Sequence, residues 1–151
     1  MIPQKRLEEL VQLAQQEAEL SIADGNGPFG AILVSENGTV IASAHNTQNT
    51  DYNASAHAEI NLLRIVGQQL KTRHLEDYAL VSNAAPCSMC MSAMVKAGVR
   101  TYYYGAEPEP TMNPSLSPSD IAEHTAFALE LHGGVLSRAC SEQIERGRRP
   151  Q

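Results

Sequence analysis

Residues 79–90 read ALVSNAAPCSMC, a short apolar run followed by Pro86 and two cysteines. The apolar run has the length of a strand, and residues 88–97 after it form a compact helical stretch. Because Cys87 and Cys90 are three positions apart, both thiols project from the same side of the first helical turn. Free backbone N–H groups and the helix dipole favour thiolates at that end of a helix. This stretch therefore predicts a strand that leads directly into a helix bearing two metal-binding or reactive thiolates.

A second segment, His57-Ala58-Glu59, opens another predicted helix, which covers residues 57–70. Two thiolates and one neutral imidazole make a three-ligand zinc site and leave the fourth tetrahedral position for water. His57 and Glu59 converge on one metal only at the frayed first turn, because positions i and i+2 do not share a face within a helix. We predict one Zn²⁺ per chain, bound by His57, Cys87 and Cys90. Glu59 beside the metal is the predicted general acid–base catalyst.

The rest of the chain alternates helices and strands, and its 151 residues suit one domain covering residues 1–151. Spacing and turn residues predict helices at 5–22, from 119 or 120 to about 131, and from about 141, and strands at 31–34, 40–44, 99–104 and 135–136. A hairpin turn at Glu36-Asn37-Gly38 joins the first two strands. An initial hairpin followed by this alternation predicts an α/β fold in three α/β/α layers, with a mixed five-stranded sheet in the middle.

Composition and charge argue against several classes of protein. The chain has 11 Lys and Arg against 17 Asp and Glu, a net charge of −6, which disfavours a large nucleic-acid-binding surface. Its three cysteines are an odd number without a secretory signal, so we expect no disulfide framework. Because the sequence lacks an apolar run of the roughly 20 residues that a membrane span needs, we expect a cytoplasmic protein with no membrane partner.

The two cysteine and histidine segments together resemble a known signature. His57-Ala58-Glu59 followed by Pro86-Cys87-x-x-Cys90 resembles the motif of the cytidine and nucleobase deaminase superfamily. The resemblance extends over roughly residues 7–136 and implies a cytidine-deaminase-like fold and hydrolytic release of ammonia from an aminated ring. It also implies that Asn46 contacts the substrate and that the backbone N–H of Ala58 binds a ring carbonyl. A homodimer is implied as well, and Ala93, Met94, Val95 and Ala97 offer it an apolar interface.

The glycine-rich loop before the first predicted strand leads Phe29 towards a pocket. Gly25, Gly27 and Gly30 match the dinucleotide-binding pattern, but a helix precedes them and a strand follows, the reverse of the order that this fingerprint needs. Pro28-Phe29-Gly30-Ala31 instead resembles the start of the first strand in guanine deaminases and bacterial tRNA adenosine deaminases. Phe29 is therefore a candidate wall of the substrate pocket.

Two substrate classes compete. A free base of the guanine or cytosine type is the first prediction and an adenosine in tRNA is the second, because a net negative charge disfavours contact with phosphates. Residues 105–110 are acidic and rich in proline, and they resemble neither group closely. Glu107 and Glu109 in this segment face either the ring nitrogens of a purine or solvent. We take both as substrate-binding candidates and expect nucleic acid not to be a partner.

Several of these residues also have simpler interpretations. Cys140 is either a fourth ligand that closes the zinc site as a structural one, or a small buried side chain. Asn46 is either a substrate contact or a turn residue after a strand. A non-catalytic zinc module that binds a partner protein is the remote alternative, and such a module would be indifferent to Glu59→Ala. The arginines at 146, 148 and 149 are expected to form a solvated basic tail.

Overall fold

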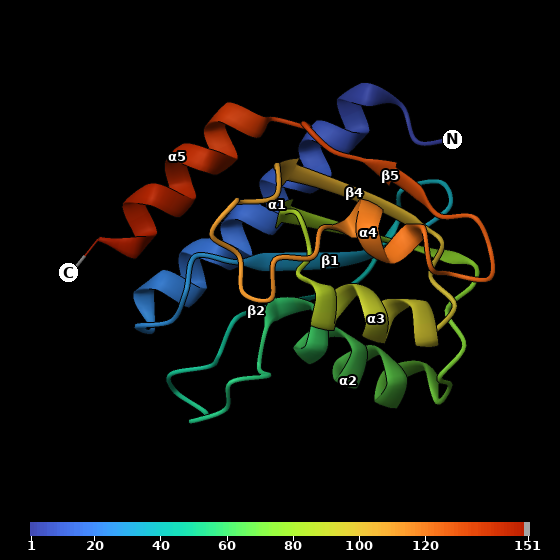
Figure 1. Ribbon diagram of the computed structural model, residues 1–151, viewed down its shortest axis with the longest axis horizontal. Coiled ribbons are helices and arrows are strands. Elements are labelled where there is room, and N and C mark those ends of the chain that lie inside the picture. The colour runs from blue at the N-terminus through green and yellow to red at the C-terminus, as the bar shows by residue number, and fades with distance from the viewer. Residues whose placement is uncertain (150–151) are drawn as a thin grey trace.

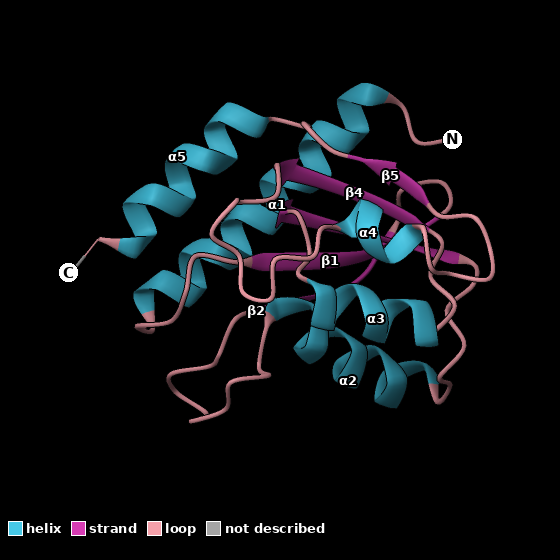
Figure 2. Cartoon of the chain, in the orientation of Figure 1, coloured by secondary structure: helices cyan, strands magenta, loops and turns pink. Residues whose placement is uncertain are grey.

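A mixed five-stranded sheet forms the centre of the computed structural model, which describes residues 1–149. Figure 2 shows its strands in magenta between the helices. Its strand order is β2-β1-β3-β4-β5. The strands are β1 (Gly30–Ser35), β2 (Val40–His45), β3 (Tyr78–Ala84), β4 (Thr101–Ala106) and β5 (Glu130–His132). β1 pairs antiparallel with both β2 and β3, whereas β3–β4 and β4–β5 are parallel. The predicted mixed sheet is confirmed.

Helices cover both faces of this sheet (Figure 1). α1 (Gln4–Ala23) and α5 (Ser137–Arg148) lie on one face, and α2 (Ala58–Leu70) and α3 (Ser88–Lys96) lie on the other; the short α4 (Pro118–Ala122) contacts α3. Successive strand residues point to opposite faces. Ile32 and Val34 therefore pack with α1 and α5, and Ala31 and Leu33 pack with α2 and α3. The three-layer α/β/α prediction is confirmed. Within residues 1–149, no helix combines the length and apolar character that a membrane crossing needs.

The elements after β4 differ from the prediction. α4 begins after Ser117, whose side chain forms a capping box with Asp120, and it ends at Ala122, so the predicted helix to about residue 131 is wrong. Residues 130–132 instead pair as the edge strand β5 with residues 101–103, and the ring of His132 stacks on Tyr103 with centroids 4.9 Å apart. The predicted strand at 135–136 is therefore misplaced, and α5 starts four residues before the predicted position.

One end of the sheet gathers the segments that build a site. β3 ends at Ala84 and β4 at Ala106, which are paired in register. Because β1 is antiparallel to β3, its first residue, Gly30, lies at the same end, paired with His45 at the end of β2. α2 and α3 begin where the chain returns from β2 and β3. Loops and two helix N-termini therefore meet at this end of the sheet.

Candidate active site

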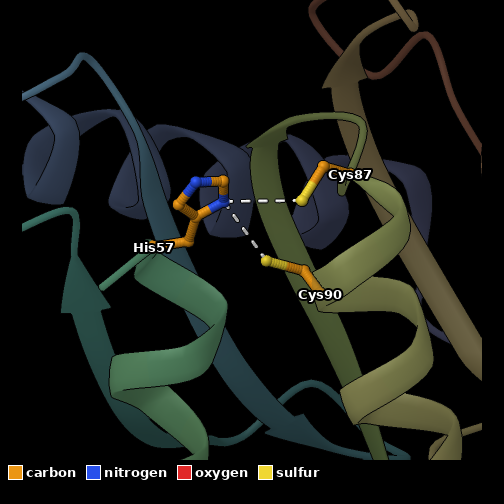
Figure 3. A group of neighbouring side chains, drawn as sticks. All are labelled: His57, Cys87 and Cys90. Carbon is orange, nitrogen blue, oxygen red and sulfur yellow. Dashed lines mark hydrogen bonds between the residues drawn. The ribbon is translucent and has the colours of Figure 1, made fainter. Parts of the chain in front are cut away.

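His57, Cys87 and Cys90 converge at the first turns of α2 and α3 (Figure 3). His57 and Cys87 are the N-cap residues of these helices, and Cys90 lies one turn into α3. The Nδ1 atom of His57 lies 3.5 Å from the Sγ atom of each cysteine, and all three ligand atoms lie within 4.8 Å of one another. Zn–S bonds of about 2.3 Å and Zn–N bonds of about 2.0 Å at a tetrahedral angle require an S···N separation of about 3.5 Å. The two S···N separations of the predicted ligands therefore match those of a zinc site.

The three ligands shift one another's pKa values. Hydrogen bonds from Cys90 and His57 to its thiolate lower the pKa of Cys87 to about 4. The same contact with Cys87 and its own burial raise the pKa of Cys90, and the hydrogen bond with Cys87 raises the pKa of His57. The Cys87 thiolate thus favours the protonated forms of His57 and Cys90. A divalent cation binds when those protons leave, which is how metal affinity couples to pH.

Glu59 is buried beside the metal ligands. It is the second residue of α2, and its side chain lines the same cavity as His57 and Cys87. Burial raises the pKa of its carboxyl group to about 7, against the opposing effects of its own backbone N–H and of His57. A carboxyl group that titrates near neutral pH both accepts and donates protons under physiological conditions.

The cavity above the ligands has a volume of about 410 Å³. This volume falls within the range of small-molecule sites. Four of the predicted substrate-binding residues line it: Phe29, Asn46, Glu107 and Glu109. Ala58 is not among the lining residues; its side chain is fully buried and its N–H lies at the start of α2.

Asn46 shows features of both interpretations. Its Oδ1 atom accepts a hydrogen bond from the backbone N–H of Gln48 at 2.9 Å, as in a turn. Its Nδ2 atom donates to the side-chain oxygen of Gln48 at 2.7 Å. Gln48, which the sequence analysis missed, also lines the cavity. Gln48 therefore orients the Asn46 amide, which keeps one N–H and one lone pair for a ligand.

The C-terminal helix supplies cavity residues that the sequence analysis also missed. Ile144 and Arg148 of α5 line the cavity, and Nη1 of Arg148 donates to both carboxylate oxygens of Glu109, at 2.7 and 2.8 Å. Arg148 is exposed, as expected of a solvated tail, but it lies in the last turn of α5 and is paired with Glu109 at the cavity. Cys140 lies instead against Gly105 of β4 and is not part of the ligand group, so the closed structural zinc site has no support.

Known proteins match both the sequence and the fold. A sequence model of the cytidine and deoxycytidylate deaminase zinc-binding region matches residues 4–106. The tRNA-specific adenosine deaminase of Bacillus subtilis is 34% identical over 132 residues, covering 87% of this chain and 81% of that protein. The guanine deaminase of Bacillus subtilis is 36% identical over 81 residues, covering 54% of this chain and 51% of that protein. The tRNA(Ile)-lysidine synthase of Deinococcus radiodurans is 33% identical over 128 residues, and the chain spans 21% of its length.

Solved structures give the same result. A structure from a study of tRNA:A34 deaminases at the wobble position has a TM-score of 0.79 and 28% identity, covering 90% of this chain and 99% of that one. The guanine deaminase of Nitrosomonas europaea has a TM-score of 0.80 over 96% of this chain and 84% of that one; at 24% identity this likeness concerns the fold alone. The chain therefore belongs to the zinc-binding family of cytidine and deoxycytidylate deaminases.

Proposed function

We propose that this chain is a hydrolytic deaminase of a free, amino-substituted heterocycle such as a guanine- or cytosine-type base. The observation that carries this proposal is the charge of the cavity. Within residues 1–149, Arg148 is the one Arg or Lys that lines it, and Glu109 already neutralises that guanidinium. Glu107 adds a further negative charge. Such a lining accepts a neutral ring and disfavours the phosphates that flank a nucleotide in RNA.

The residues at the base of the cavity divide the chemistry between them. His57, Cys87 and Cys90 would hold zinc, which when bound supplies the Lewis acid that makes water a nucleophile at neutral pH. Glu59 takes a proton from the attacking water and returns it to the departing nitrogen. The ring carbon thus exchanges its C–N bond for a C–O bond, and ammonia leaves.

The upper part of the cavity would orient the ring. Phe29 offers an aromatic face, and Asn46 and the N–H of Ala58 offer polar contacts to ring atoms. Glu107 and Glu109 each have a neighbour already. Glu109 is paired with Arg148, and the Glu107 carboxylate lies so close to Gly133 that a Cβ there would be 2.6 Å from its Oε1 atom. Each carboxylate keeps free lone pairs that could accept a hydrogen bond from ring N–H groups.

A tRNA adenosine is the second candidate substrate. It is favoured by the identity of 34% with a tRNA-specific adenosine deaminase over 81% of that protein. This relative leaves the expectation against a nucleic-acid partner without support, and a direct measurement must decide between the two classes.

The deciding experiment measures steady-state ammonia release with guanine, cytosine and an anticodon stem-loop at equal concentrations. We expect turnover of a free base and none of the stem-loop, with Glu59→Gln as the matched blank. Efficient turnover of the stem-loop, with none of either base, would overturn the proposal in favour of the tRNA substrate.

We also propose that the chain forms a homodimer. Of the predicted interface residues, Met94 is fully buried in the core and cannot face a partner, whereas Ala93 and Val95 on α3 are partly exposed. Light scattering at micromolar concentration should give twice the mass of the chain. A monomer under these conditions would contradict the proposal.

A further inference from the structure

A second cavity of about 320 Å³ adjoins the catalytic one. The two cavities share five lining residues, which are Ala106, Glu107, Glu109, Ile144 and Arg148. The second cavity is completed by Ser141 and Glu145 on the outer side of α5. These shared residues therefore form a partition, with Glu59 and the metal ligands on one side and the exposed surface of α5 on the other.

The partition is completed by an ion pair between two distant segments. Arg148, in the last turn of α5, bonds to both carboxylate oxygens of Glu109, in the loop after β4. The guanidinium also lies over the ring of Phe29, 5.5 Å from its centroid. Three segments, separated by at least 39 positions in the sequence, thus meet at one side chain.

The position of Arg148 is fixed by the packing of α5. Gly147 lets the last turn of this helix approach the loop before β1, because a Cβ at position 147 would lie 2.5 Å from Cβ of Pro28. One turn earlier, the side chain of Gln143 accepts a hydrogen bond from buried Asn83 at 3.1 Å and donates one to the Gln15 carbonyl at 2.8 Å. The helix end is therefore held in place, while the ion pair itself is half-exposed.

We propose that the Arg148–Glu109 pair is a specificity gate between the two cavities. With the pair formed, the catalytic cavity takes an unsubstituted ring. With the pair broken, the cavities join and admit the same ring carrying a neutral substituent such as an N-linked sugar. Glu107 and Glu145 in the lining disfavour a phosphate on that substituent. A half-exposed ion pair is weak, so its loss should leave the fold intact. The inference rests on the proposed deaminase function.

The test compares kcat/KM for a base and for its nucleoside, guanine against guanosine and cytosine against cytidine. We expect Arg148→Ala and Glu109→Gln each to raise the nucleoside-to-base ratio by about tenfold or more, the scale on which pocket contacts discriminate substrates. The double variant Glu109→Arg with Arg148→Glu should bring the ratio back towards that of the parent. The matched control is Arg138→Ala, which removes an exposed ion pair with Glu142 on the same helix, outside both cavities.

A second readout does not depend on turnover. The rate at which ortho-phenanthroline, a flat three-ring chelator, removes zinc from the holoenzyme reports access to the catalytic cavity. We expect Arg148→Ala and Glu109→Gln to raise this rate severalfold and Arg138→Ala to leave it unchanged. If the parent releases ammonia from neither base, the proposed function fails and the chelator rates judge the gate alone. An unchanged chelator rate, or a parent enzyme that prefers nucleosides to bases, would overturn the gate.

Discussion

The two walls of the catalytic cavity are built in contrasting ways. The inner wall, made of His57, Glu59 and Cys87, comes from the first turns of two helices packed on the sheet, and Glu59 is only 7% exposed. The outer wall, made of Phe29, Glu109 and Arg148, comes from two loops and a helix end, and the side chains of its ion pair are 41% and 49% exposed. The proposed reaction chemistry needs the fixed geometry of the inner wall. The outer wall, to which we assign substrate choice in our proposal, can change at low cost to stability.

The family match includes the whole inner wall but only Phe29 of the outer wall. It covers residues 4–106, and Glu109 and Arg148 lie beyond it. Membership of the family accordingly identifies the metal site, whereas the ion pair that we propose as a specificity gate lies outside the match.

The largest effect on zinc content and turnover is expected from removing a metal ligand in the inner wall. Cys87→Ala removes one of three protein ligands, so we expect loss of bound zinc and of all turnover. Metal analysis of the purified variant measures this directly. Cys140→Ala is the matched control, because Cys140 is buried away from the ligand group and its removal should leave one zinc per chain. Full zinc occupancy in Cys87→Ala would contradict the assignment of the ligands.

Glu59→Gln should remove catalysis and leave the structure of the inner wall unchanged. The amide has the same shape but cannot accept a proton from water, and general acid–base steps contribute about 10²–10⁴-fold each. We expect kcat to fall by about that factor, with unchanged zinc content and melting temperature. Activity within a few-fold of the parent would refute the role of Glu59. A non-catalytic zinc module, by contrast, would release no ammonia before or after the change.

Asn83 of β3 tests how the loop that carries Phe29 in the outer wall is held to the sheet. Its buried side chain accepts a hydrogen bond from Gly30 N–H at 3.1 Å and donates to the Pro28 carbonyl at 2.9 Å. Asn83→Ala leaves both groups buried without these bonds, which should cost about 2–4 kcal/mol. That loss corresponds to a fall of about 5–15 °C in melting temperature. Gln12→Ala, at an exposed position of α1, is the control. Equal melting temperatures for the two variants would show that the hydrogen bonds of Asn83 do not stabilise the fold.

The smallest effect on stability is expected at the outer wall. Arg148→Ala removes a half-exposed ion pair, and such pairs contribute about 0–1 kcal/mol. The melting temperature should therefore shift by no more than about 4 °C, measured beside Arg146→Ala, which breaks a comparable pair with Glu19. A loss of several kcal/mol would mean that the outer wall belongs to the structural core, and the contrast between the walls would disappear.

The inner wall could be predicted from sequence because its determinants are local. Two of the metal ligands, His57 and Cys87, are the N-cap residues of their own helices. Gly98 follows the end of α3 with a φ of +88°, the left-handed conformation that makes glycine a signal of a helix end. The hairpin between β1 and β2 could be predicted in the same way, because the turn residues Glu36-Asn37-Gly38 directly connect the two strands. In each of these cases, the interacting residues are close in the sequence or share one helical turn.

The outer wall could not be predicted because its contacts are remote. Arg148 and Glu109 are 39 positions apart, and nothing local to either residue indicates the other. β5 was mistaken for the end of a helix because residues 126–131 are mostly good helix formers. Its strand conformation comes from pairing with the edge of β4, a tertiary contact that overrides local propensity. The helix start at Ser137 follows Leu136 in a left-handed conformation, which has no sequence signal in a leucine.

The close contact between Gly147 and Pro28 offers a single position at which the placement of α5 can be varied by engineering. Because the missing side chain of Gly147 is what allows α5 to rest on Pro28, a graded series of replacements would act as wedges of increasing size. Alanine, serine and valine at this position should push the helix end away from Pro28 by increasing amounts, at an increasing cost in stability. A library at this one position would therefore vary the placement of the helix turn that carries Arg148.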